Sequence, residues 1–224
     1  MHLTILTWIL TGISITTAAN VWVDTLTSKI ARQIQPKNLF VYTSKANNIV
    51  TSKSDLLIQK VNQEIPVLTL DFKDVKRIRY GESLIVPERK LVDKDLELSL
   101  VLYHRDNDSS SNLQKLEGLL IDFTKAYGIF PRPRCLIIFF NNIASLKVEF
   151  ESFLERAWSL KFLDLIVIEV FLNDKNIEDD SLYIYSYNPF FKIYQQEFFN
   201  ETASIFPDKL VDLNGLEFIV EALH

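Results

Sequence analysis

The stretch Arg134–Phe140, RCLIIFF, decides the fold, because every residue after the arginine is apolar. A strand with one face in water alternates apolar and polar residues, whereas a strand of a parallel sheet is covered on both faces and reads as a continuous apolar run. Residues 162–172, FLDLIVIEVFL, show the same pattern, interrupted by two carboxylates. These two runs predict buried strands of a mostly parallel sheet.

Strand and helix patterns alternate along the chain on both sides of these runs. Helical spacing of apolar residues covers residues 22–34, 54–62, 113–127 and 150–158. Strand patterns cover residues 38–43, 66–70, 96–103, 134–140, 162–172 and 182–187, with a further short strand expected at 83–86. Strands separated by helices predict an α/β fold with an open, mostly parallel sheet and flanking helices, as in a Rossmann-like or periplasmic-binding-protein-like lobe.

Several residues indicate where these helices and strands begin or end. Ser54 is available as the N-cap of the second helix, and Ser111 with Gln114 forms a capping box before the third. Gly128 stands where the C-terminal cap of that helix belongs. The alternation of residues 182–187, LYIYSY, is typical of an edge strand.

Composition removes several classes of function. The chain has 224 residues, with 24 Lys+Arg against 29 Asp+Glu and a net charge of −5, so it lacks the basic surface that a general nucleic-acid binder needs. One cysteine and three scattered histidines exclude an internal disulfide, a cysteine-based zinc cage and a histidine metal site. The five glycines form no GxGxxG motif, P-loop or nucleophile elbow, and no cofactor is expected.

The loop His104–Asp108, HRDND, is the strongest candidate for acid–base or metal chemistry. Its first three residues match the catalytic triplet of protein kinases, but Ser111 stands where that motif requires asparagine, and no glycine-rich loop or DFG motif accompanies it. A solvated turn that leads into the following helix explains the same residues without chemistry. We therefore expect no catalytic residue in this chain and predict that it is not an enzyme.

The amino terminus has the pattern of a secretory signal. Residues 1–19 combine an apolar core with small residues before a cleavage point after Ala19. An uncleaved anchor or a buried first helix are the other interpretations, and later apolar runs are too short to span a membrane, so the mature chain should have no transmembrane helix. A secretory route makes Asn107 and Asn200, each in an N-x-S/T sequence, candidate glycosylation sites.

Four stretches of the carboxyl half together carry a family resemblance. They are RCLII at 134–138 with the following Asn141–Asn142, AWS at 157–159 continuing to Asp164, YNPF at 187–190, and IFPDKL at 205–210 continuing to Gly215. In this order they resemble the extracellular amino-terminal region of insect chemosensory ionotropic receptors, which are divergent relatives of ionotropic glutamate receptors. The residues that carry the resemblance most specifically are Trp158, Asn188, Pro189, Phe206, Pro207, Asp208, Lys209, Leu210 and Gly215.

The resemblance implies a role in a ligand-gated cation channel that opens on binding an odorant or tastant. It implies other receptor subunits as partners, and a place on the extracellular face of the plasma membrane or secretion as a fragment. Residues 20–202 then form the amino-terminal domain, and residues 203–224 begin a truncated ligand-binding domain. The family's ligand-contacting and pore segments lie beyond this chain, which we therefore expect to be a fragment, a truncated product or a pseudogene-like relative. We expect its tail at 211–224 to be either loosely attached or docked on the lobe in a manner unlike that of the family.

A second function stays open at this point. The chain could be a free-standing secreted α/β binding protein for a small hydrophobic ligand. Paired phenylalanines at 139–140, 190–191 and 198–199 are the candidates for lining its cavity, although the first pair belongs to a predicted core strand.

Overall fold

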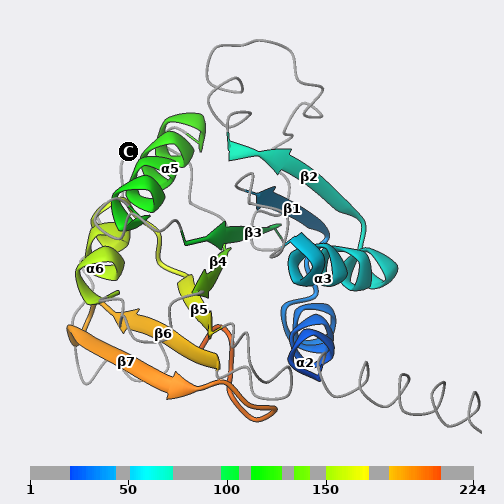
Figure 1. Cartoon of the computed structure of the whole chain (residues 1–224). Helices are drawn as coiled ribbons and strands as arrows, with labels where there is room; N and C mark the ends of the chain where they lie inside the picture. The colour runs from blue at the N-terminus through cyan, green and yellow to red at the C-terminus, as the bar shows by residue number, and fades with distance from the viewer. Residues whose placement is uncertain are drawn as a thin grey trace, which may run out of the picture.

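The computed structural model describes residues 21–43, 51–72, 97–105, 112–127, 134–141, 150–171 and 182–207. These residues form one seven-stranded sheet in the order β2-β1-β3-β4-β5-β6-β7 (Figure 1). The strands are β1 Asn38–Thr43, β2 Val67–Asp71, β3 Glu97–His104, β4 Arg134–Asn141, β5 Leu165–Phe171, β6 Leu182–Asn188 and β7 Ile193–Phe198. Strands β1 to β5 pair in parallel, while β6 and β7 are antiparallel to their neighbours.

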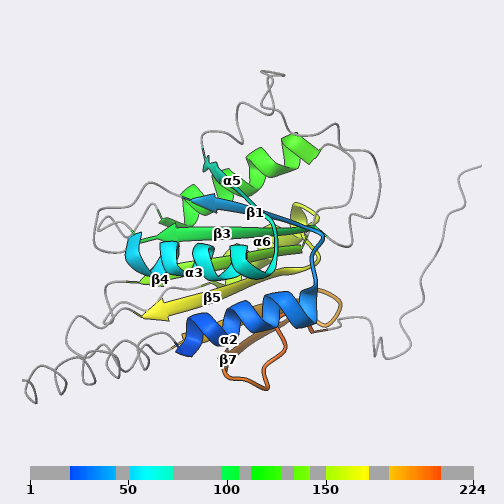
Figure 2. The ribbon, with the colours of Figure 1, turned by 90° about the vertical axis from the view of Figure 1, so that its right-hand side faces the viewer.

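Helices cover both faces of the sheet. They are α2 Val21–Lys29, which continues as the π-helical turn η1 Ile30–Ile34, then α3 Thr51–Glu64, α5 Asn112–Tyr127 and α6 Glu151–Ser159. Helices α2 and α3 lie on one face and α5 and α6 on the other (Figures 1 and 2). The predicted α/β class, with an open and mostly parallel sheet, is confirmed.

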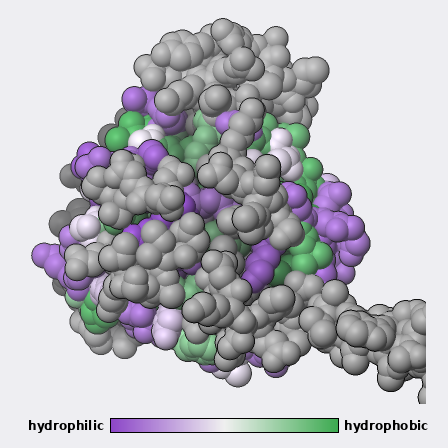
Figure 3. Space-filling view, viewed as in Figure 1, coloured by the Kyte–Doolittle hydropathy of each residue, from purple (hydrophilic) through white to green (hydrophobic). Residues whose placement is uncertain are grey.

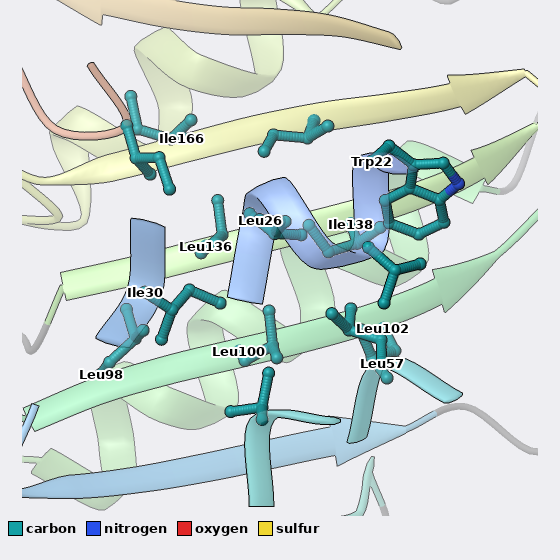
Figure 4. Close-up of a cluster of buried hydrophobic side chains, with 14 of the residues drawn as sticks. Trp22, Leu26, Ile30, Leu57, Leu98, Leu100, Leu102, Leu136, Ile138 and Ile166 are labelled. Atoms are coloured by element: carbon teal, nitrogen blue, oxygen red, sulfur yellow. The ribbon is translucent and has the colours of Figure 1, made fainter. Parts of the chain in front are cut away.

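Each face of the sheet has its own hydrophobic core. The first core joins Leu98, Leu100 and Leu102 of β3 to α2, η1 and α3, and the second joins Val101 and Tyr103 of the same strand to α5 and α6. Successive side chains of a strand point to opposite faces, which explains this division. Figure 4 shows Leu26 of α2 among the strand residues of the first core.

Strand β4 is the centre of the fold. All of its residues from Cys135 to Asn141 are buried, because α2 covers one face and α5 and α6 cover the other. The prediction from RCLIIFF is thus confirmed. Burial raises the pKa of the Cys135 thiol to about 12, so this cysteine acts as a small apolar side chain.

Two local expectations are wrong. Helix α3 begins at Thr51, so Ser54 lies inside its first turns and cannot be the N-cap. Strand β6 is not an edge strand, because β7 pairs with it along its whole length after a tight turn in which Lys192 adopts a φ of 54°. The sequence of β7, IYQQEF, shows no apolar alternation, and the turn uses lysine where glycine would have signalled it.

The segment after β7 returns to the first core. Phe199 and Ile205 are both buried there, and Phe206 packs against the same cluster. The packed unit therefore includes residues beyond position 202, where the sequence placed the domain boundary. The expected strand at 83–86, the cap residues Ser111 and Gly128, the signal segment 1–19 and the tail 211–224 lie outside the described residues.

Candidate functional site at the carboxyl edge of the sheet

The strand order locates the place where an open α/β sheet usually binds its ligand. From β1 the chain crosses to β2 through α3 in the first core, and from β3 it crosses to β4 through α5 in the second core. The two connections run in opposite directions, so the topological switch point lies between the carboxyl ends of β1 and β3. The connecting segments 44–50 and 106–111 lie outside the described residues.

His104 ends β3 at this switch point and faces the first core. Its ring stacks on Phe140 at 4.6 Å between centroids, and its Nε2 lies 3.4 Å from the Ser54 hydroxyl of α3. Burial lowers the pKa of His104 to about 4, and the nearby Asp55 carboxylate opposes only part of that shift. The imidazole is therefore neutral at physiological pH.

The Ser54–His104 pair is poorly suited to catalysis. A general base works best when its pKa lies near the operating pH, and that of His104 is well below it. Ser54 is buried between α3 and the sheet, which shields its hydroxyl from a substrate. The pair instead connects the first turns of α3 to the end of β3.

A second group of polar residues crosses the opposite face of the sheet. The Arg105 Nη1 donates to Asn141 Oδ1 at 3.0 Å, and Asn141 Nδ2 donates to Glu169 Oε1 at 2.8 Å. The Tyr185 hydroxyl donates to Glu169 Oε2 at 2.7 Å. These four residues, here called the buried polar chain, connect the residue after β3 to β4, β5 and β6 in order.

The hydrogen bonding of the buried polar chain suits a structural role. Glu169 has an exposed fraction of 0%, and each of its carboxylate oxygens accepts a hydrogen bond from a neighbouring strand. Burial, together with the bond to Glu169, raises the pKa of Tyr185, which therefore remains a protonated donor. A buried carboxylate needs such donors because an unpaired buried charge is strongly unfavourable.

Only one member of the buried polar chain is signalled by the sequence. Glu169 was visible as a charged residue inside an apolar strand, which itself requires a polar partner. Its donors come from positions 28 residues before and 16 residues after it, and no local pattern links them. Among the described residues, no group of three His, Cys, Asp or Glu side chains is arranged to hold a metal ion.

The described residues among those that carry the resemblance most specifically lie away from this edge and act through packing. The Trp158 ring contacts Phe190 edge-on at 5.9 Å, and Asn188 Oδ1 accepts the Phe190 N–H at 3.1 Å. Pro189 lines a small hollow together with Trp158. The Arg134 guanidinium lies 5.7 Å from the centre of the Phe206 ring. Pro207, the last described residue, follows Phe206 directly.

Asn200 is exposed in a turn after β7. Its Oδ1 accepts the N–H of Thr202 at 2.9 Å, the hydroxyl of Thr202 at 2.7 Å and the N–H of Ala203 at 2.9 Å. This arrangement fixes the side chain through its oxygen and leaves both sequon residues on the surface. The other predicted residues lie outside the described part of the chain, namely Asn107, Asp208, Lys209, Leu210 and Gly215.

The phenylalanine pairs are not brought together into one cavity. Phe139 lies in the second core, whereas Phe140 and Phe199 lie in the first. Phe198 is exposed on β7, and Phe190 packs on Trp158. The described members of the pairs therefore lie in separate places.

A polar hollow of about 380 Å³ lies between α2, η1 and the turn after β7. Its lining residues are Asp24, Thr25, Ser28, Lys29, Arg32, Gln33 and Glu201. Lys29 is almost fully buried beside it and donates from Nζ to the backbone oxygens of Glu201 at 2.6 Å and Ala203 at 2.5 Å. This lysine holds the last described segment against the first helix.

Comparison with known proteins gives no match: no family model, no curated protein and no solved structure resembles the chain significantly. Among the described helices, none is both long enough and apolar enough to cross a membrane. Function must therefore be argued from the chain's own sequence and geometry.

Replacing Glu169 with glutamine should destabilise the protein. The substitution keeps the volume but turns an amide donor toward Asn141 or Tyr185, which both donate to the present carboxylate. We expect a loss of about 1–3 kcal/mol in the free energy of unfolding, measured by urea denaturation. The control Glu64→Gln, at an exposed position of α3, should change it by less than about 0.5 kcal/mol. Additive losses in a double variant with Tyr185→Phe would contradict a connected chain.

Acid should destabilise the protein partly through His104. Its pKa is near 6.5 in the unfolded chain and about 4 in the folded one, so the unfolded state binds more protons between these values. The contribution is fully present above pH 6.5 and is lost as the pH falls toward 4. His104→Phe keeps a ring against Phe140 and removes the titration. The variant should therefore lose less stability than the wild type over this window in urea titrations, and parallel pH profiles would contradict the assignment.

Proposed function

We propose that the chain is a non-enzymatic extracellular α/β module, the amino-terminal region of a chemosensory ligand-gated cation channel of the ionotropic receptor type. The observation that carries the proposal is that the described parts of the four resembling stretches contact one another. The Cys135 N–H donates to the Asp164 oxygen at 2.8 Å, which links the first stretch to the second. Trp158 links the second to the third through Phe190, and Arg134 links the first to the fourth through Phe206.

These contacts explain why such residues would identify a domain and not a reaction. Arg134 also forms an ion pair with Asp164 at 3.6 Å, between the starts of β4 and β5. The residues named in these contacts fix turns and element ends away from the carboxyl edge. Asn141, which follows the first stretch, lies at that edge, where it bonds to Arg105 and Glu169. A signature of this kind supports a shared fold, which is what the resemblance implies for the amino-terminal domain.

The candidate site supports a role without catalysis. The Ser54–His104 pair is buried and its histidine is a weak base, while the buried polar chain is occupied with its own hydrogen bonds. The module would then act in folding and assembly with other receptor subunits. Odorant or tastant binding would fall to the ligand-binding domain that residues 203–224 begin.

The alternative of a secreted binding protein for a small hydrophobic ligand has less support. It requires an apolar cavity, and the described phenylalanine pairs lie in separate places. The larger hollow beside Lys29 is lined by charged and polar residues. We therefore favour the receptor module.

The encoding transcript tests the proposal directly. A receptor requires an open frame that continues past His224 into a ligand-binding domain and three membrane spans. A mature transcript with a stop codon after His224, together with a secreted product that binds a hydrophobic probe in a ligand-shift screen, would establish the alternative instead.

Secretion should attach glycans to Asn200 and Asn107. In a eukaryotic secretory host, glycosidase treatment should lower the mass of the product, and Asn200→Gln and Asn107→Gln should each remove one step. Thr202→Ser keeps the hydroxyl of the sequon and should retain the glycan, whereas Thr202→Ala should lose it.

Secretion should also remove the signal segment, so amino-terminal sequencing of the secreted product should give a sequence that begins at Asn20. An unchanged mass, or a product that begins at Met1, would contradict the secretory assignment.

A further inference from the structure

Strand β7 ends the sheet with an unusually open edge. Its side chains are largely exposed, including Ile193 at 48% and Phe198 at 56%. Within the described part of the chain, β6 is its one strand neighbour. Figure 3 shows hydrophobic and hydrophilic residues side by side at the lower left, where Figure 1 places β6 and β7. Natural edge strands are usually protected by proline, by charged residues such as lysine, or by a bulge. The sequence IYQQEF contains no proline or lysine, its register with β6 is continuous, and Glu197 is its one charged residue.

The pairing with β6 shows which backbone groups of β7 point outward. The Phe199 N–H donates to the Leu182 oxygen at 2.9 Å, and the register continues from Tyr183 opposite Phe198. In an antiparallel pair, residues whose backbone N–H and C=O groups point toward the neighbouring strand alternate with residues whose backbone groups point away from it. Tyr194, Gln196 and Phe198 therefore turn their N–H and C=O groups away from β6.

These three residues form a self-complementary edge. A two-fold axis perpendicular to the sheet keeps its faces unchanged, so residues that become opposite must share a face. With the axis at Gln196, this residue pairs with itself, and Tyr194 pairs with Phe198 of the second copy. The outward N–H and C=O groups of Tyr194, Gln196 and Phe198 then all have a hydrogen-bond partner in the second copy. With the axis at Gln195, Phe198 would face Lys192, which lies in the turn at a φ of 54° and cannot continue a strand.

The side chains favour the same register. On the second-core face, Phe198 already lies 5.9 Å from Tyr183, and Tyr194 lies 6.1 Å from Tyr185, measured between ring centroids. A Tyr194–Phe198 pair across the axis would continue these aromatic rows from one copy into the next. On the other face Gln195 would lie opposite Glu197, so no like charges meet.

We propose that the chain forms a two-fold dimer through antiparallel pairing of β7 with β7 of a second copy, centred on Gln196. The sheet then runs continuously across both copies, and the exposed Phe198 is covered. The other edge strand, β2, begins directly after Pro66 and is a weaker candidate. This proposal does not depend on the receptor assignment.

Proline at position 196 tests the pairing. Gln196→Pro removes an outward N–H and blocks the edge, while the hydrogen bonds to β6 come from the other residues of the strand. The full chain should sediment as a dimer at high concentration and dissociate on dilution. Gln196→Pro should remain a monomer, and the matched control Gln196→Thr, which keeps the N–H, should still dimerise. Thermal melting checks that both variants remain folded.

Single cysteines test the register independently. Cys135 is the one native cysteine and is buried, so an introduced surface thiol is the reactive one. In the proposed register the two Cα atoms of residue 196 lie about 5.5 Å apart, within the range that a disulfide spans. Those of residue 195 lie about 8 Å apart, which is too far. Under mild oxidation, Gln196→Cys should form a covalent dimer and Gln195→Cys should not.

Three outcomes would overturn the proposal. The first is a wild-type chain that stays monomeric at every concentration. The second is a dimer that survives in a folded Gln196→Pro variant, which would place the interface elsewhere. The third is cross-linking of Gln195→Cys as efficient as that of Gln196→Cys, which would exclude the register centred on Gln196.

Discussion

The central strands are apolar on both faces, and the need to cover both faces organises the rest of the molecule. Helices α5 and α6 cover one face as the connections on either side of β4. On the other face, α3 reaches the side of the sheet near β1, and α2, which precedes the first strand, covers the remainder (Figure 1). Trp22, Leu26 and Ile30 lie over β3, β4 and β5 in Figure 4, and the Trp22 ring meets Phe140 at 6.4 Å. Each such side chain contributes about 1.5–3 kcal/mol by leaving water.

The buried carboxylate inside this apolar frame has its hydrogen-bond partners on the two neighbouring strands. Glu169 occupies the face of β5 that packs against α6, and its two oxygens are bonded to β4 and β6. The junction between parallel β5 and antiparallel β6 is therefore fixed by side chains as well as by backbone pairing. Replacing such a group by an apolar one of equal size can be neutral, whereas removing one member alone is unfavourable. Removing any one of the four residues of the buried polar chain is therefore unfavourable, because its partner loses a hydrogen bond inside the protein.

Much of the fold could be predicted from the sequence, because the spacing of apolar residues indicates which face of a helix or strand is buried. The continuous run at β4 and the stripe of Leu116, Leu120 and Phe123 on α5 were predicted with nearly their observed bounds. Strand β7 was missed because an exposed edge strand buries no face and so has no periodic signal. The contact of Ser54 with His104 and the donors to Glu169 were missed because they join residues distant in the chain. Periodicity shows that a residue is buried, but the fold decides what lies next to it.

The contact between Lys29 and the turn after β7 has a consequence for synthesis of the chain. Lys29 ends the first described helix, and its acceptors lie 172 and 174 residues later. Domains form from the amino terminus as the chain leaves the ribosome. Helix α2 emerges first, but Lys29 can form these hydrogen bonds only after Glu201 and Ala203 have emerged. Until then the apolar stripe of α2 lacks this anchor, so the first core is completed only when nearly all of the described chain has been synthesised.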